Sequence, residues 1–216
     1  ALAVFVHPAT GAPRLACGCG DGKVRIFDPV AGGEALLVID VGLVVWALAV
    51  FADPATGAPR LACASREKVL VFDPVAGGDA LLVLDIGSEV KTLAVFKKPA
   101  TGAPRLACGC KDGKVRVFDA VSGGDALLAL DAGDSIVFAL VAFKDLATGA
   151  LRLASGSDDE KVRVFDPVAG GEALVVLEGH TEWVNHLKVF TDPATGETRL
   201  VSGSRDSTAR VWNPAA

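Results

Sequence analysis

The stretch RLACGCGDGKVRIFDPVAGGEALLVID, residues 14–40, decides the fold, because it returns three more times along the chain and then once more in truncated form. The aromatic residues that close the third apolar run of each copy are Phe27, Phe72, Phe118, Phe165 and Trp212. Their spacings are 45, 46, 47 and 47 residues. Short β-type runs and turn residues fill each repeat, so a period of this length predicts a stack of repeated sheets.

The last copy indicates how one repeat folds. Alternating apolar residues in WVNHLKVF (183–190) predict a first strand, which we label a, and TDPATGETR after it has the Pro and Gly of a turn. RLVSGSR (199–205) predicts strand b, a tight turn follows at Asp206, and ARVWN (209–213) predicts strand c. Between repeats, PVAGGEALVVLEG contains a Gly-Gly turn and a strand d at 173–177. Four antiparallel strands per repeat form one blade of a β-propeller.

We therefore predict an all-β fold, a β-propeller of four-stranded antiparallel blades, with four complete blades and strands a, b and c of a fifth. The expected blades cover about 1–40, 41–85, 86–131, 132–178 and 179–216, within a single domain of residues 1–216. The chain contains no Met and opens inside the strand-like run ALAVFV. We therefore expect it to be the C-terminal part of a larger, seven-bladed propeller. A full-length reading frame that begins at Ala1 with its own start codon would contradict this expectation.

Composition narrows the functional classes. The net charge is −5 and no run of Lys or Arg exceeds two residues, which argues against general nucleic-acid binding. Gly, Pro or a charged residue interrupts every apolar run before 18 residues, so no membrane-spanning segment is expected. Neighbouring cysteines in one strand are poorly placed to form a bridge, and their spacing is not that of a zinc site. We expect no metal or cofactor and an intracellular, cytoplasmic or nuclear, reducing location for the five cysteines, Cys17, Cys19, Cys63, Cys108 and Cys110.

The final repeat carries a family resemblance. EGHTEWVNHLKVF followed by RLVSGSRDSTARVWN, within residues 178–213, resembles a WD repeat, with Gly-His before strand a, Ser-Gly-Ser in strand b, Asp in the b–c turn and Trp closing strand c. Internal similarity extends the resemblance over the whole chain, although the other four copies carry Phe in place of Trp. In WD repeats the His, Ser, Asp and Trp form a buried hydrogen-bond network. The resemblance implies this structural role for His180, Ser202, Asp206 and Trp212.

A Ser, a His and an Asp also suggest a hydrolase triad, but the sequence favours the structural interpretation. It contains neither a G-x-S-x-G nucleophile elbow nor an oxyanion-donor loop, so we predict that the protein is not an enzyme. The copies with Phe lack the Trp donor and the His together, and we expect no polar group to be left unpaired in them. Cys17, Cys63 and Cys108 replace the Ser in three of them.

The connections of the repeat point to one variable surface. In a propeller the d–a and b–c connections emerge on one face, which we call the top face, and these connections differ between the copies. The a–b connections at the bottom repeat as close variants of PATGAPR. Exposed Trp and Arg commonly anchor interfaces, although Trp46 and Phe138 could instead pack between blades. The candidate contact residues are Leu43, Val44, Trp46, Arg66, Glu89, Lys91, Lys111, Ser135, Ile136, Asp158, Glu182, Trp183 and Arg205.

The resemblance implies a non-catalytic scaffold that binds protein or peptide partners through the top face. One alternative is an incomplete or designed array that self-associates through the unpaired edge of its fifth blade to close the ring. A lesser alternative is a propeller that binds or transforms a small molecule or glycan in its central funnel. That alternative requires carboxylates or a His at the channel-facing ends of the a strands, where the sequence predicts mostly apolar side chains.

Overall fold

In the computed structural model, which describes residues 1–214, nineteen strands form five separate sheets and no helix is present. Four sheets have four strands and the last has three, which confirms the predicted all-β fold of four complete blades and a partial fifth. Within every sheet the strands follow the chain order and pair antiparallel. The seven-bladed complete ring stays a prediction.

Each repeat of the sequence corresponds to one sheet. Blade 1 consists of β1 (Leu2–Val6), β2 (Pro13–Gly18), β3 (Lys23–Phe27) and β4 (Leu37–Asp40). Blade 2 consists of β5 (Ala47–Ala52), β6 (Pro59–Ser65), β7 (Lys68–Phe72) and β8 (Leu82–Asp85). Blade 3 consists of β9 (Val90–Lys97), β10 (Pro104–Cys110), β11 (Lys114–Asp119) and β12 (Leu128–Asp131). Blade 4 consists of β13 (Val137–Lys144), β14 (Leu151–Ser157), β15 (Val162–Phe165) and β16 (Val175–Leu177). Blade 5 consists of β17 (Val184–Thr191), β18 (Thr198–Ser204) and β19 (Ala209–Trp212).

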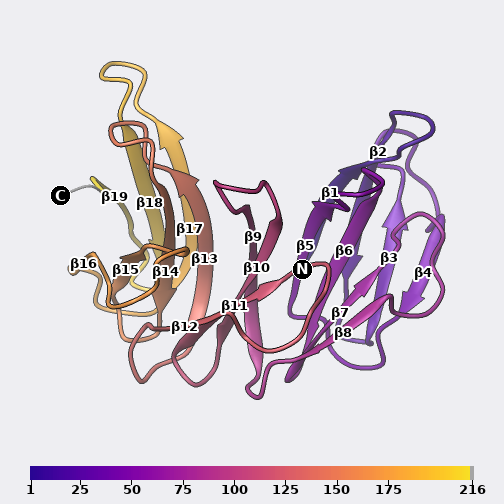
Figure 1. The fold of residues 1–216 in the computed structure, drawn as a ribbon, viewed down its shortest axis with the longest axis horizontal. Helices are drawn as coiled ribbons and strands as arrows, with labels where there is room; N and C mark the ends of the chain where they lie inside the picture. The colour runs from indigo at the N-terminus through magenta and orange to yellow at the C-terminus, as the bar shows by residue number, and fades with distance from the viewer. Residues whose placement is uncertain (215–216) are drawn as a thin grey trace.

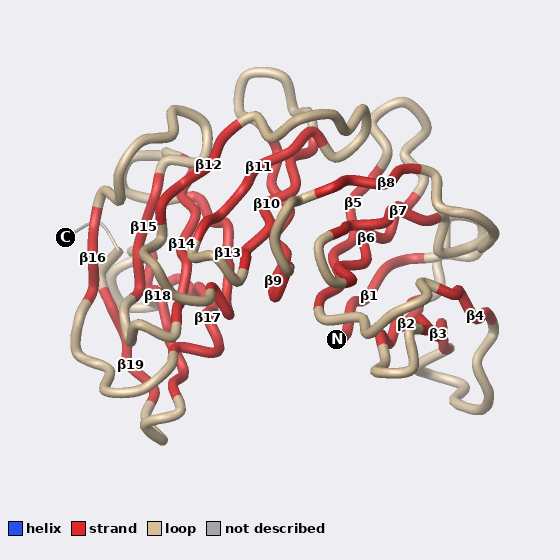
Figure 2. Tube along the Cα trace, turned by 90° about the horizontal axis from the view of Figure 1, so that it is seen from below, coloured by secondary structure: helices blue, strands red, loops and turns tan. Residues whose placement is uncertain are grey.

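The blades follow one another along an arc (Figures 1 and 2). The first strands β1, β5, β9, β13 and β17 lie next to each other in this order and form the inner side of the arc. In Figure 2 blade 1 and blade 5 lie at its two ends. The top-face connections of all five blades therefore surround one central region.

The apolar core lies between consecutive blades. Phe5 of blade 1, for example, belongs to one buried cluster with Leu61, Cys63 and Phe72 of blade 2. The same positions form the cores between blades 2 and 3, 3 and 4, and 4 and 5. Because successive side chains of a strand point to opposite faces, each blade uses one set of residues toward the preceding blade and another toward the next.

Repeated ion pairs secure the bottom turns. The carboxylate of Asp28 accepts hydrogen bonds from the backbone N–H groups of Val30 and Ala31 and pairs with Arg14 at 3.0 Å. Equivalent pairs join Arg60 to Asp73, Arg105 to Asp119 and Arg152 to Asp166. Hydrogen bonds from the turn amides hold the pKa of Asp28 below its ordinary value. The same device recurs in the c–d turns of blades 1 to 4 and joins each turn to the start of strand b.

Candidate functional site

Register shifts at the start of the a strands direct side chains toward the centre of the arc. The pairing of β9 with β10 skips Lys91, that of β13 with β14 skips Phe138, and that of β17 with β18 skips Asn185. Trp46 holds the matching position immediately before β5, where its N–H donates to the carbonyl of Ala64. A residue that the strand pairing skips in this way directs its side chain differently from the regular alternation of the strand. All four side chains line a central cavity of about 650 Å³.

Trp46 and Lys91 form one contact across the boundary between blades 2 and 3. The ammonium nitrogen of Lys91 lies 3.8 Å from the centre of the Trp46 ring, which is the geometry of a cation–π interaction. The same nitrogen lies 2.6 Å from Glu89 Oε1, and Lys111 Nζ lies 3.7 Å from Glu89 Oε2. The hydrogen bond from Lys91 lowers the pKa of Glu89. Four predicted residues thus form one charged cluster, which we call the Trp46 cluster.

Trp183, Phe138 and Arg205 form the second contact, between blades 4 and 5. The rings of Phe138 and Trp183 stack with their centres 5.4 Å apart and an interplanar angle of 19°. The guanidinium carbon of Arg205 lies 4.6 Å from the centre of the Trp183 ring. Trp183 remains 38% exposed and Trp46 46% exposed. Both Trp46 and Phe138 therefore contact a side chain of the next blade, and the Trp46 ring stays largely exposed. We call these three residues the Trp183 cluster.

The remaining predicted residues lie around these clusters. Leu43 and Val44 are exposed in the connection before β5, and exposed Arg66 has the left-handed φ of +51° in the b–c turn of blade 2. The carbonyl of Ser135 accepts a hydrogen bond from the Ser157 hydroxyl, and the carbonyl of Ile136 accepts one from the backbone N–H of Asp158. The carbonyl of Glu182 accepts one from the Ser204 hydroxyl. These bonds hold the backbone of the predicted residues Ser135, Ile136, Asp158 and Glu182 in the top face. Arg66 lines a small surface pocket together with Glu89 of the Trp46 cluster.

The sequence-based interpretation missed three polar residues of blade 5. Asn185, His186 and Lys188 line the central cavity, where mostly apolar side chains were expected. His186 is exposed in β17. It occupies the register position of Ala47 and Ala139, which also line the cavity, so alignment of the paired strands would have identified it. No carboxylate is among the residues that line this cavity in the described part of the chain.

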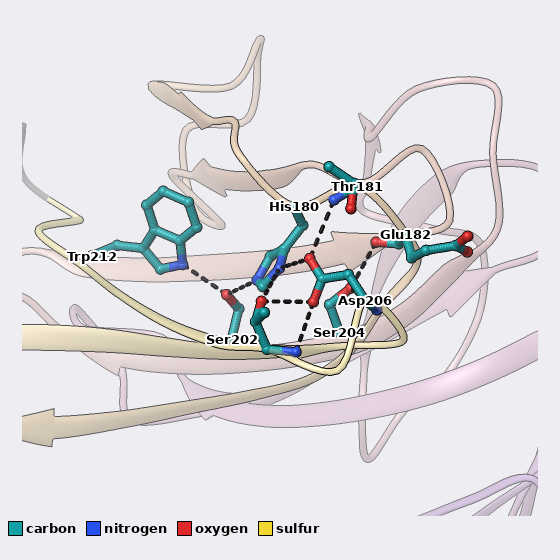
Figure 3. A network of polar contacts seen from close by, with 8 residues as sticks. His180, Thr181, Glu182, Ser202, Ser204, Asp206 and Trp212 are labelled. Carbon is teal, nitrogen blue, oxygen red and sulfur yellow. Dashed lines mark hydrogen bonds and ion pairs between the residues drawn. The ribbon is translucent and has the colours of Figure 1, made fainter.

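The structure brings His180, Ser202, Asp206 and Trp212 together (Figure 3). His180 Nδ1 lies 2.7 Å from Asp206 Oδ2, and His180 Nε2 lies 2.7 Å from Ser202 Oγ. Trp212 Nε1–H donates to the same Ser202 oxygen at 2.7 Å. Because a carboxylate only accepts, Nδ1 of His180 carries the proton, and Ser202 donates its hydroxyl proton to Nε2. Every polar group in this chain of contacts is therefore used.

The network is buried and positions the top loops. His180 is 5% exposed and Ser202 is fully buried, so the Ser202 hydroxyl is closed to a substrate. Asp206 also accepts hydrogen bonds from the Thr208 hydroxyl and the backbone N–H of Thr181, which fasten the connection before β17 to the b–c turn. The hydrogen bond from Thr208, followed by that from His180, holds the pKa of Asp206 far below its ordinary value.

The b–c turn aspartates have other partners in the remaining blades. Asp21, Asp112 and Asp159 pair with the arginines four residues later at 2.7, 2.7 and 2.6 Å, respectively. These pairs form where the preceding connection has no His. The expectation that no polar group is left unpaired in the copies with Phe is wrong for blade 4. The buried Ser155 Oγ, the counterpart of Ser202, has no hydrogen-bond partner within residues 1–214, because Phe165 replaces the Trp donor.

The cysteines are free thiols, and burial protects three of them from reaction. All five are free, and Cys63, Cys108 and Cys110 are buried. Burial raises the pKa of Cys63 to about 12 and that of Cys110 to about 11, so both thiols stay protonated at neutral pH. Across residues 1–214, no group of three or more His, Cys, Asp or Glu side chains is placed to hold a metal ion. The same residues contain no helix that is long and apolar enough to cross a membrane.

Comparison with known protein families gives one match. Residues 171–213 match the family described as "WD domain, G-beta repeat". The match begins before β16 and ends just after β19, so it contains all four members of the His180 network. No curated protein matches the chain.

Proposed function

We propose, on the premise that residues 171–213 match the WD-repeat family, that this chain is a non-catalytic scaffold that binds protein or peptide partners through its top face. The binding surface in this proposal consists of the Trp46 cluster, the Trp183 cluster and the exposed connections beside them. Two ring-and-cation clusters beside one central cavity are the observation that carries the proposal.

The two tryptophans have the properties of interface anchors. Trp and Arg are enriched among residues that dominate binding energies, and both occur in the Trp183 cluster. Each exposed ring is also held by a neighbour before any partner arrives: Trp46 by Lys91 and Trp183 by Phe138. Because these side chains are already ordered, less conformational entropy is lost on binding.

The chemistry of the described residues supports binding over catalysis. The Ser202 hydroxyl lies inside the His180 network, and the buried thiols are protonated. The central cavity presents Lys91, His186 and Lys188 without a carboxylate among its lining residues in the described chain. This composition disfavours acid–base chemistry that depends on a pair of carboxylates. The proposal also places the five blades in one intracellular domain, which the free cysteines support.

A peptide selection tests the proposed surface. A displayed library of random peptides is selected on the immobilised chain, and the affinity of each selected peptide is then measured for Trp46→Ala, Trp183→Ala and a control. Val30→Ala is the control, because Val30 is 81% exposed in a c–d turn of the bottom face. At least about tenfold weaker binding to either Trp variant, with unchanged binding to Val30→Ala, supports the proposal. Equal binding to all variants would place recognition elsewhere.

A further inference from the structure

Three consecutive blade boundaries each carry a small pocket on the bottom face, and equivalent residues line all three. Between blades 3 and 4 the pocket has a volume of about 180 Å³, and its apolar lining includes the buried Phe96 and Val117. The exposed Leu127 and Val168 line it as well, the latter from the c–d turn of blade 4. The pockets between blades 2 and 3 and between blades 1 and 2 have volumes of about 220 and 130 Å³.

One charged position distinguishes these pockets. The residue that follows strand a is Asp53 in the pocket between blades 2 and 3 and Lys98 in the pocket between blades 3 and 4. At both positions the backbone N–H donates to the carbonyl of the Ala five residues later. The two side chains therefore start from equivalent backbone positions and carry opposite charges.

The arginine of each pocket shows what this exchange of charge changes. Arg60 and Arg105 both donate from Nη1 to the Asp of the c–d turn in their own blade. Arg60 also donates from Nη2 to the carboxylate of Asp53 at 3.2 Å. In blade 3 the structure records, within residues 1–214, neither a partner for Arg105 Nη2 nor an ion pair for Lys98. This pocket therefore has two cationic side chains where the neighbouring pocket already holds a carboxylate.

We propose that the pocket between blades 3 and 4, which we call the Lys98 pocket, binds the C-terminal residue of a protein or peptide partner. The apolar side chain of that residue packs against Phe96 and Leu127, and its terminal carboxylate pairs with Lys98 and Arg105. Asp53 supplies the internal precedent, because its carboxylate holds this place in the neighbouring pocket. Hydrogen bonds between a cation and a carboxylate are about twice as strong as those between neutral groups. The site lies on the bottom face and does not depend on the proposed binding through the top face.

The size of the Lys98 pocket favours one amino-acid residue over a larger ligand. Small-molecule sites have volumes of about 300–1,000 Å³, whereas a cavity of about 150 Å³ is sufficient for a benzene-sized group. A pocket of about 180 Å³ therefore accommodates a single Leu side chain. A C-terminal residue carries its carboxylate and its side chain on the same Cα, so one pocket takes both. An internal Asp or Glu needs a neighbour for the apolar contact, and successive side chains of an extended chain point to opposite sides.

The pocket between blades 1 and 2 should bind such a residue more weakly. His7 stands at the position of Lys98, and its Nδ1 accepts a hydrogen bond from the backbone N–H of Ala9 at 3.3 Å. This pocket also has the smallest volume of the three. We therefore expect Lys98 to determine the affinity.

Fluorescence anisotropy of the complete chain with short peptides labelled at the N-terminus tests the proposal. The probe is a peptide of Gly and Ser that ends in Leu with a free carboxylate. Three matched peptides carry a C-terminal amide, Gly as the last residue, or an internal Leu-Glu pair before an amidated end. We expect the probe to bind at least about tenfold more tightly than each of the three. Equal binding of any of them, or no saturable binding of the probe up to about 1 mM, would overturn the proposal.

An exchange of charge between the two pockets locates the site. Lys98→Asp introduces the residue type that blades 2, 4 and 5 carry at this position, so the variant should fold, which circular dichroism checks. It should bind the probe at least about tenfold more weakly, and adding Asp53→Lys to it should restore binding at the neighbouring pocket. The control Lys97→Asp makes the same change at an exposed neighbour outside the pocket and should keep the wild-type affinity.

Two results would contradict the assignment to the Lys98 pocket. Unchanged binding in Lys98→Asp would place recognition elsewhere, and an equal loss in Lys97→Asp would mean that the peptide responds only to net charge. Trp183→Ala should bind the probe like the wild type, so a failure of this proposal is distinguishable from a failure of the proposed binding through the top face.

Discussion

Ser155 and Ser202 occupy the same register position in consecutive blades, yet the two hydroxyls have opposite surroundings. Ser202 Oγ contacts His180 Nε2 and Trp212 Nε1, both at 2.7 Å. Ser155 Oγ is equally buried and has no partner among the described residues. Phe165 stands where Trp212 stands in blade 5. The same residue type is therefore stabilising in one blade and costly in the next.

Replacing Ser155 with Cys should stabilise the protein. A buried polar group without a partner costs about 1–3 kcal/mol, and Cys occupies this position in blades 1 to 3. We expect Ser155→Cys to raise the free energy of unfolding by about 1 kcal/mol or more, measured by urea titration. The matched variant Ser202→Ala should lower it by about 1–3 kcal/mol, because it orphans His180 and Trp212. A loss of stability in Ser155→Cys would indicate that its hydroxyl has a partner in solution.

The contribution of Asp206 should depend on pH. Its pKa in the folded protein is depressed, so its stabilising effect is present above its unfolded pKa of about 3.9 and is lost as the pH falls through the folded value. At neutral pH, Asp206→Asn should unfold at a lower urea concentration than the wild type. This difference should shrink as the pH falls below about 4, because Asp206 of the unfolded state then takes up a proton that the folded state takes up only at much lower pH. A difference that is constant from pH 7 to pH 2 would refute the assignment.

The two ends of the arc should tolerate substitutions that the interior does not. Truncating a fully packed Phe costs about 3–5 kcal/mol, so Phe143→Ala should lower the free energy of unfolding by this amount. Phe190→Ala should cost less than about 2 kcal/mol in dilute solution, because its side chain is already 41% exposed. Urea unfolding of both variants at low protein concentration makes the comparison. Equal losses would mean that Phe190 is covered in the monomer.

Trp183→Ala should change the melting temperature only modestly. The variant removes the stack on Phe138 and the contact with Arg205, which are together worth about 1–2 kcal/mol at an exposed site. For a chain of this length each kcal/mol corresponds to about 2–4 °C. Differential scanning calorimetry checks the shift. A loss much larger than this would show that Trp183 belongs to the core, and its use as a binding probe would then fail.

The thiols should react in two groups. Cys63, Cys108 and Cys110 are buried with raised pKa values, whereas Cys17 and Cys19 are half-buried in blade 1. In the native protein at pH 8, a maleimide should modify Cys17 and Cys19 first, and mass spectrometry of peptides identifies the sites. The denatured protein should react at all five cysteines and serves as the control. Early modification of Cys108 would contradict the packing between blades 2 and 3.

The repeat spacing predicted the blades because a period of 45–47 residues is visible in the letters alone. The positions of Trp183 and Ile136 at the start of the a strands followed from the same alignment. Contacts between blades were harder to predict. The Trp46–Lys91 and Phe138–Trp183 pairs each join residues about 45 positions apart. They depend on the curvature of the arc and on register shifts in the strand pairing, and no glycine in the sequence marks where those shifts occur.

The polar side chains inside the blades were also predictable only in part, as the His180 network and the isolated Ser155 show. The motif in blade 5 identified four residues that the structure brings within hydrogen-bond distance. The partners of the b–c turn aspartates in other blades were not predicted, because an Arg four residues later competes for the carboxylate only once the turn is folded. The surroundings of Ser155 likewise depend on which side chains a neighbouring strand and connection supply.

Because equivalent register positions form the core between every two consecutive blades, a chain of this kind can change in length by whole blades. Joining blade 2 directly to blade 4 would bring Phe51, Val69 and Val71 against Leu153, Ser155 and Phe165, and only Ser155 differs from the residue types that blade 3 presents. A recombination event between two repeats would therefore add or remove one sheet without a compensating change in the core. Copy number in this chain is a property that duplication can alter in a single step, while the packing of each remaining sheet stays the same.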